Sequence, residues 1–303
     1  MSLIVFNLDS DASLFDRLAT AMSANKGELE QRKFPDGESY LRVLTDCKLH
    51  DVVIFCNLYQ PDNKILRLLF LASTLKEMGA NQIGLITPYL PYMRQDKQFH
   101  HGECVSSRPF AKLLSGSIDL LITMDPHLHR YDSLDEIYTL KSRVVSAAPL
   151  IAHWIQQHIS NPLLIGPDME SEQWVSEVAR LADAPFQILA KVRHGDTLVE
   201  ISPPELEPYA NTTPVLIDDI ISSGNTMLET IHHLTLAKMK RPVCIGVHGI
   251  FAESAFAQLQ QFADVITTQC ISHPSNKIDI ALALAEATLS LINEKRDETP
   301  CKL

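Results

Sequence analysis

Short apolar runs alternate with amphipathic stretches along almost the whole chain, and this alternation constrains the fold more than any other feature. Short apolar runs are typical of buried strands, whereas apolar residues three and four positions apart are typical of helices that bury one face. Residues 63–78 show the helical spacing and end at Gly79, a residue type that commonly ends helices. The alternation therefore predicts an α/β protein with mainly parallel sheets wrapped by helices.

The pattern places most of the expected elements. Strands are predicted at residues 3–6, 52–57, 83–87, 120–124, 163–166, 186–190, 215–218, 243–248 and 265–268. Helices are predicted at residues 63–78, 106–114, 171–181, 226–238 and 254–262, with a terminal helix at 278–294.

The two halves of the chain resemble each other loosely. Each half contains several buried strands, a polar loop with acidic residues at a strand end, and then a helix. A length of 303 residues also exceeds one ordinary domain of about 150 residues. We therefore expect two similar α/β domains, residues 1–143 and 144–303, and allow for the terminal helix to pack back on the first.

Charge and cysteine usage narrow the possible partners. The chain has 26 Lys and Arg against 37 Asp and Glu, a net charge of −11, so it has no general basic surface for a nucleic acid. An anionic ligand would need a few local cations or a metal. The longest apolar stretch is too short to cross a membrane, and the six cysteines are scattered without a CxxC pair. We expect a cytoplasmic protein that binds neither membranes nor nucleic acids.

Residues 215–226 carry the strongest functional signal: an apolar strand ends in two carboxylates, and a small polar loop then leads into a helix. Ligands of open α/β sheets bind beyond the carboxyl ends of the strands. The loop can hold a phosphate at the helix start, while the carboxylates can accept hydrogen bonds from a vicinal diol. An ordinary helix cap, the alternative, does not explain the paired acids. A sugar-phosphate site is therefore predicted at Asp218, Asp219, Ser222, Ser223, Gly224, Asn225 and Thr226.

A second candidate site lies in the first half of the chain. Phe34 can stack on an adenine ring, and Asp36 or Glu38 can accept from its exocyclic amine. The ordinary reading is a Pro-Asp-Gly turn between two strands, and both readings can hold together. Arg94 can grip phosphate oxygens, although the segment around it could equally be a solvated surface loop.

Two basic residues in the second half suit phosphoryl chemistry. Lys191 and Arg193 alternate along an extended stretch, so both lie on one side and can neutralise charge on a transferring group. Taken alone, they would be read as exposed basic residues at a strand end. The chain contains neither the P-loop pattern nor the GxGxxG pattern. We therefore expect neither a P-loop that holds ATP nor a dinucleotide-binding loop.

These motifs together resemble those of the ribose-phosphate diphosphokinases, the enzymes that make phosphoribosyl diphosphate (PRPP). Six segments match the family in its order and cover nearly the full length: 34–38 (FPDGE), 94–97 (RQDK), 124–127 (MDPH), 166–168 (GPD), 191–193 (KVR) and 215–226 (VLIDDIISSGNT).

The resemblance implies two phosphoribosyltransferase-like domains, the first binding ATP and the second ribose 5-phosphate, with Mg²⁺ as cofactor. It also implies a homo-oligomer, dimer or higher, whose ATP site is shared between subunits. ATP would be held by Phe34, Asp36, Glu38, Arg94, Gln95 and Asp96. The metal would be held by His127 and Asp168, and the catalytic residues would be Lys191, Arg193 and His127.

The chain departs from the family pattern at several places. Asn225 stands where the phosphate loop commonly has glycine, and Glu170 follows Asp168 where glycines are common. After His127 the chain continues as LHRY rather than the QxQGFF stretch that helps to build the bacterial and mammalian allosteric site for ADP and phosphate. It therefore looks closer to the archaeal-type branch. Two alternatives stay open, a PRPP-consuming phosphoribosyltransferase and a non-catalytic regulatory subunit.

Overall fold

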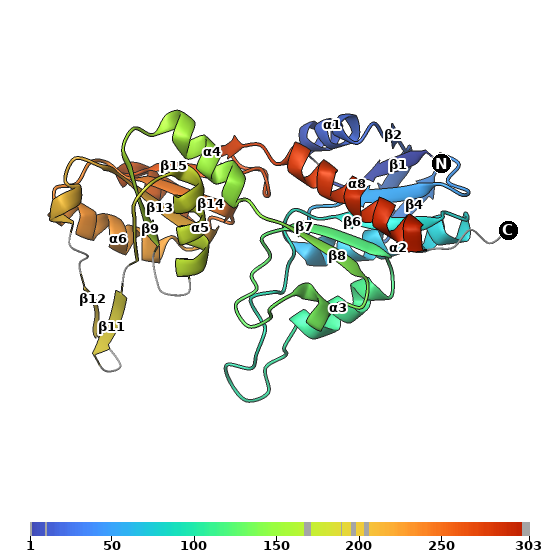
Figure 1. Cartoon of the computed structure of the whole chain (residues 1–303). Coiled ribbons are helices and arrows are strands. Elements are labelled where there is room, and N and C mark those ends of the chain that lie inside the picture. Colours follow the sequence, from blue (N-terminus) through green and yellow to red (C-terminus); the bar gives the residue numbers. More distant parts are fainter. Residues whose placement is uncertain are drawn as a thin grey trace. The chain divides into compact units, whose positions relative to one another are not determined.

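The computed structural model describes residues 2–9, 11–166, 171–188, 190–194, 198–202 and 206–298. The chain divides into two compact units (Figure 1). Unit 1 comprises Met1–Val145 and Ala281–Leu303, and unit 2 comprises Ser146–Ile280. Among the described residues, no helix combines the length and the apolar character needed to cross a membrane.

Unit 1 contains a six-stranded parallel sheet with the order β2-β1-β5-β6-β7-β8. Its strands are β1 (Leu3–Asn7), β2 (Asn25–Lys26), β5 (Asp51–Phe55), β6 (Gln82–Ile86), β7 (Leu120–Met124) and β8 (Lys141–Val145). An antiparallel hairpin, β3 (Leu29–Lys33) with β4 (Ser39–Val43), is inserted between β2 and β5.

Helices cover both faces of the unit 1 sheet. They are α1 (Ala12–Ala21), α2 (Ile65–Glu77), α3 (Ser107–Ser115) and α8 (Ala281–Glu298). Ile54 belongs to a buried core with Leu71 of α2 and Leu114 of α3. Its neighbour Phe55 lies on the opposite face, where its ring is 6.2 Å from that of Phe15 in α1. Helix α8 packs against α1, β7 and β8, so the C-terminal helix is part of unit 1 (Figure 1).

Unit 2 repeats this plan with the sheet order β10-β9-β13-β14-β15-β16, again all parallel. Its strands are β9 (Pro162–Gly166), β10 (Phe186–Ile188), β13 (Thr213–Ile221), β14 (Val243–Gly249), β15 (Asp264–Thr268) and β16 (Asn276–Ile278). Its helices are α4 (Ala148–His158), α5 (Glu172–Ala182), α6 (Asn225–Leu236) and α7 (Ala255–Phe262). The antiparallel ribbon β11 (Ala190–His194) and β12 (Leu198–Ser202) projects from this unit in Figure 1.

The two units are therefore the same fold used twice. In both, the second strand of the sheet in chain order pairs beside the first at one edge, the remaining strands follow in sequence, and an antiparallel ribbon comes after that second strand. The predicted fold class, two similar domains each with a mainly parallel sheet flanked by helices, is confirmed.

The apolar pattern did not predict several of the observed elements. Strand β8 has the sequence KSRVV and lies at the edge of its sheet, where only one neighbour has to be matched. Helices α1 and α4 were also missed, and the predicted strand 186–190 ends at Ile188, with a separate ribbon strand starting at Ala190. Strand β13 continues to Ile221 instead of ending at Asp218, because its last residues still pair with β14.

Candidate functional site

The two predicted acids, Asp218 and Asp219, lie within β13 near its carboxyl end and not in the loop that follows the strand. Asp218 pairs with Gly246 of β14, and pairing continues to Ile221 beside Gly249. Both Asp218 and Asp219 are half-buried, and the Asp219 backbone amide donates to Asp218 Oδ1 over 3.0 Å. The acids therefore lie on a hydrogen-bonded strand whose position is set by β14.

The loop that follows β13 is short and closely fitted. Gly224 has φ +73°, and a β-carbon at this position would lie 3.1 Å from Leu259 Cδ1 of α7. A side chain here would therefore be strained both by the backbone and by the contact. On the other side of the loop, the Ser222 carbonyl accepts a hydrogen bond from the Ala252 amide over 3.1 Å. The loop is thus held to the segment after β14.

Helix α6 begins at Asn225, immediately after this loop. The left-handed residue of the loop is Gly224, and Asn225 is helical. The departure from the family's glycine at position 225 therefore leaves the loop intact. The first amides of α6 have no acceptor within the helix, and together with the Ser222 and Ser223 hydroxyls they can bind a phosphate.

In unit 1, the loop after β7 carries His127. Asp125 has φ +32°, and its amide donates to the Val145 carbonyl over 3.1 Å, which turns the chain at the strand end. The rings of His127 and His129 lie with their centroids 3.7 Å apart. Mg²⁺ prefers oxygen ligands, so two imidazoles do not by themselves form a magnesium site. Asp168, the predicted carboxylate ligand, and Glu170 lie outside the described residues.

The three residues of the predicted ATP segment, 94–96, differ in how deeply they are buried. Arg94 is exposed and Gln95 is half-buried, whereas the Asp96 side chain is only 1% exposed. Arg130 Nη1 donates to both carboxylate oxygens of Asp96, over 2.9 and 3.0 Å. Of the three predicted residues, Arg94 and Gln95 therefore have side chains open to a ligand, and the Asp96 carboxylate is bonded within the unit. Sequence reasoning missed Arg130.

The chain is also anchored two residues before this segment. Tyr92 has φ +64°, and its hydroxyl donates to the Asp62 carboxylate in the loop before α2. This hydrogen bond, with burial and the charge of Asp62, raises the pKa of Tyr92 to about 12. The tyrosine thus stays protonated at ordinary pH and joins the predicted ATP segment to the neighbouring loop.

Residues 34–38 form the turn of the β3–β4 hairpin, as the Pro-Asp-Gly sequence predicts. The Phe34 amide donates to the Glu38 carbonyl over 2.8 Å, and Asp36 Oδ1 accepts from the Glu38 amide over 3.1 Å. The Phe34 ring is 38% exposed, and the Arg32 guanidinium lies 4.6 Å from its centroid. The turn presents a partly exposed aromatic ring with carboxylates beside it.

The predicted catalytic pair lies on the ribbon of unit 2. Lys191 pairs with Ile201, and Arg193 pairs with Val199. The two positions are separated by one residue of the same strand, as the sequence suggested, so they share one face of the ribbon.

Comparison with known proteins identifies the family of this chain. Residues 3–117 match the family model for the N-terminal domain of ribose phosphate pyrophosphokinase, and residues 133–285 match that for the phosphoribosyl transferase domain. The chain is 30% identical over 293 residues to the ribose-phosphate pyrophosphokinase of Methanopyrus kandleri, covering 95% of this chain and 99% of that protein. This chain belongs to the ribose-phosphate pyrophosphokinase family.

Other relatives extend the likeness. The ribose-phosphate pyrophosphokinase of Methanobrevibacter smithii is 32% identical over 271 residues, covering 85% of this chain and 90% of that one. These relatives are archaeal, which agrees with the predicted likeness to the archaeal-type branch. The crystal structure of phosphoribosylpyrophosphate synthetase from Mycobacterium smegmatis has the same fold, with a TM-score of 0.84, 22% identity, and coverage of 97% of this chain and 100% of that one.

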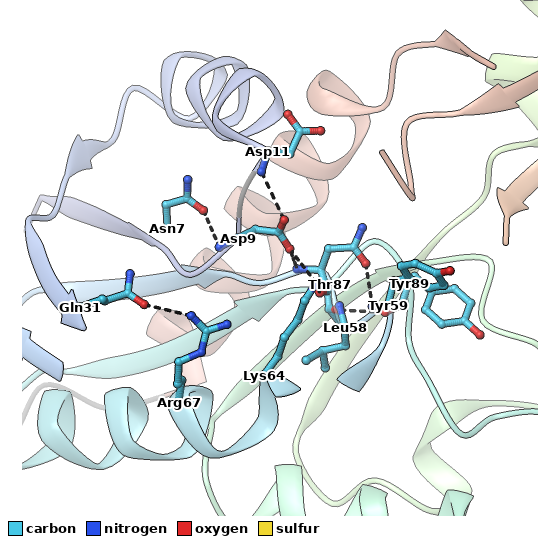
Figure 2. Close-up of polar contacts among 11 residues, drawn as sticks. Asn7, Asp9, Asp11, Gln31, Leu58, Tyr59, Lys64, Arg67, Thr87 and Tyr89 are labelled. Carbon is cyan, nitrogen blue, oxygen red and sulfur yellow. Dashed lines mark hydrogen bonds and ion pairs between the residues drawn. The ribbon is translucent and has the colours of Figure 1, made fainter. Parts of the chain in front are cut away.

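One polar cluster lies outside the pyrophosphokinase motifs predicted from the sequence. At the carboxyl ends of β1 and β5, Asp9 Oδ2 accepts from the Asn57 amide over 2.9 Å and from Lys64 Nζ over 3.3 Å (Figure 2). Lys64 Nζ also donates to the Asn57 carbonyl over 2.6 Å, and Asn7 Oδ1 accepts from the Asp9 amide over 2.8 Å. The Asp9 side chain is only 7% exposed.

This cluster occupies the place in unit 1 that the predicted phosphate loop, residues 222–224, occupies in unit 2. Strand β5 is the third strand of its sheet in chain order, as β13 is in unit 2, and each leads through a loop into a helix. After β13 the loop offers amides and hydroxyls, whereas after β5 the ammonium group of Lys64 lies against Asp9 and Asn57 (Figure 2). The position in unit 1 that corresponds to the loop after β13 is thus occupied by the ion pair between Lys64 and Asp9.

Proposed function

We propose that this chain catalyses the reaction ATP + ribose 5-phosphate → AMP + PRPP. The C1 hydroxyl of the sugar attacks the β-phosphorus of ATP, the bond from that phosphorus to the α-phosphate oxygen breaks, and AMP leaves while the hydroxyl proton is released. The observation that carries this proposal is the junction of β13, Gly224 and α6, which suits a sugar phosphate, in a chain of the pyrophosphokinase family.

In unit 2, the proposed sugar site uses two kinds of group. Asp218 and Asp219 accept hydrogen bonds from the ribose hydroxyls, and the phosphate lies at the start of α6. Ser222, Ser223 and Thr226 supply hydroxyl groups, and Gly224 and Asn225 supply amides. Because the Ala252 amide already holds the Ser222 carbonyl, part of the loop is ordered before the sugar binds.

In unit 1, the proposed nucleotide site uses Arg94 and Gln95, with Asp96 holding their segment in place. Phe34, Asp36 and Glu38 contact the nucleotide bound by a neighbouring copy of the chain, so the proposal includes a homo-oligomer of two or more subunits. The partly exposed Phe34 ring at the tip of a hairpin supports this role.

Lys191 and Arg193, on the β11–β12 ribbon, are proposed to stabilise the charge on the transferring diphosphoryl group. Mg²⁺ accompanies ATP in the proposal, with His127 and Asp168 as its protein ligands by family resemblance, and it would neutralise phosphate charge. No covalent nucleophile is required, because positioning and charge stabilisation suffice for this transfer.

The test is ³¹P NMR of the purified protein with ATP, Mg²⁺ and ribose 5-phosphate. We expect the signals of AMP and PRPP to grow together, and only when the sugar phosphate is present. Formation of ADP would mean γ-phosphoryl transfer and would contradict the mechanism. If the folded protein gives no turnover, incubation of PRPP with nucleobases separates the two alternatives: consumption of PRPP indicates a transferase, and none indicates a regulatory subunit.

A further inference from the structure

Arg130 lies between two segments of unit 1 that the proposed function uses. It follows His127 and His129 in the loop after β7, and its guanidinium reaches residue 96, 34 positions earlier in the chain. Since Asp96 comes directly after Arg94 and Gln95, one side chain connects the His127 loop to the nucleotide segment.

The burial of Asp96 makes this contact strong. A carboxylate whose side chain is 1% exposed has lost most of its hydration, so leaving it without a partner of opposite charge would be costly. Arg130 provides that partner with two short contacts, while its own side chain remains 41% exposed. The pair is therefore anchored at the carboxylate end and open to solvent at the arginine end.

Neighbouring residues fix the backbone around the same point. The Tyr131 hydroxyl lies 3.4 Å from the Asp96 carbonyl and 3.1 Å from Ser107 Oγ. The Ser107 amide, at the start of α3, donates to the Gln95 carbonyl over 3.4 Å. Residues 95 and 96 are thus held from the His127 loop and from α3, and these contacts leave the Arg94 side chain exposed.

We propose that Arg130 is a positioning residue for nucleotide binding: by pairing with Asp96 it sets the conformation of the segment that presents Arg94 and Gln95. This inference rests on the proposed function only in that the segment binds ATP. Asp96 then acts on the nucleotide through the backbone of its segment, and Arg130 acts through Asp96.

The test compares Arg130→Met with Arg130→Lys in the full chain. ATP binding is measured by calorimetry without sugar phosphate, and KM for both substrates is measured with sugar phosphate present. We expect Arg130→Met to weaken ATP binding and to raise KM for ATP by about tenfold or more, because a misplaced segment loses binding geometry. KM for ribose 5-phosphate should stay within about twofold, since the contacts described for Arg130 involve Asp96 and Phe99 and reach no residue of the proposed sugar site. Arg130→Lys should recover part of the loss.

Two further variants keep the test decisive. Arg143→Met removes an arginine that pairs with Glu294 between β8 and α8, over 2.7 and 2.8 Å, and should leave both KM values unchanged. If Arg130→Met fails to fold, the double variant Asp96→Asn with Arg130→Met removes the unpaired buried charge. It should fold and still bind ATP more weakly than the native chain.

The outcomes separate the two proposals. Native-like ATP binding by a folded Arg130→Met or by the double variant would overturn the positioning role. An equal rise in KM for both substrates would also overturn it, because it would indicate a general structural defect. If the native chain binds ATP but makes no PRPP, the proposed function fails while the comparison of ATP affinities still decides the role of Arg130. If the native chain does not bind ATP, both proposals are overturned.

Discussion

Arg296, near the end of α8, donates two hydrogen bonds to the buried carboxylate of Asp51 at the start of β5, 245 positions earlier. The bond from Arg296 Nε is 2.7 Å long, and the second carboxylate oxygen accepts from Asn81 Nδ2, also over 2.7 Å. Asp51 is fully buried, so the terminal helix supplies the only cation described beside a carboxylate that water does not reach. This contact fastens the last described helix to the sheet of the first unit.

Replacing Arg296 with methionine should destabilise the protein by about 3 kcal/mol, because it leaves the Asp51 carboxylate buried without its counter-charge. Urea unfolding followed by circular dichroism measures the change. The control is Lys295→Met, which removes a partly exposed ion pair with Asp119 at 3.4 Å and should cost less than about 1 kcal/mol. Equal losses for the two variants would mean that Asp51 does not depend on Arg296.

Replacing Gly224 with alanine should raise KM for ribose 5-phosphate by about tenfold, since a left-handed alanine costs roughly 1–2 kcal/mol and the new methyl group meets Leu259. Asn225→Gly is the matched control. Because Asn225 is already helical, this variant should change KM for the sugar by much less. Steady-state kinetics at saturating ATP give both values, and a larger effect at position 225 would contradict the loop geometry.

Replacing Lys64 with methionine should cost about 1–3 kcal/mol of folding free energy, because Asp9 and the Asn57 carbonyl lose a shared donor. Lys26→Met, which breaks an exposed pair with Asp16, should have almost no effect. Chemical denaturation compares the two variants. A loss at position 26 as large as that at position 64 would argue against a special role for the buried cluster.

Acidification should weaken unit 2 through His273. Burial against Phe251 and Phe256, each with its ring centroid 4.5 Å away, lowers the pKa of His273 below its ordinary value of 6.5. The folded state therefore favours the neutral ring, so this contribution to stability is complete above about pH 6.5 and declines as the pH falls below it. His273→Gln should flatten the decline in urea midpoints, whereas His232→Gln, which removes an exposed imidazole, should not.

Replacing Lys191 with alanine should lower kcat by about 10²–10³-fold while ATP binding stays measurable, because the proposed role is confined to the transition state. Val192→Ala, at the next position of β11, controls for damage to the ribbon. Coupled assays of AMP formation report kcat, and calorimetry reports ATP binding. An unchanged kcat would remove Lys191 from the mechanism.

Most of the central strands could be predicted, because the apolar residues that mark a buried strand are neighbours in the sequence. A strand covered on both faces needs a nearly continuous apolar run, so β5, β6, β7 and β14 all stand out from the polar loops around them. Edge strands and the two ribbons lack this pattern, since solvent on one side accepts polar residues. Their sequences alone do not separate them from loops.

For the candidate site, too, some features could be predicted from the sequence and others could not. The order of the motifs, the turn at residues 34–38 and the glycine of the phosphate loop follow from residue types at short spacings, which local geometry interprets directly. The sequence could not show that Asp96 is buried against Arg130, or that Lys64 pairs with Asp9 at the place in unit 1 that corresponds to the predicted phosphate loop. These contacts join residues 34 and 55 positions apart.

By itself, then, the sequence determined the fold class, the family and the segments that can meet phosphate and sugar, since each depends on local periodicity or on short runs of residues. The tertiary structure decided which charged side chains are paired inside the protein and which remain exposed. The physical reason is that burying a charge is costly without a partner, and partners such as Asp51 with Arg296 or Asp96 with Arg130 are chosen by the packing of distant elements.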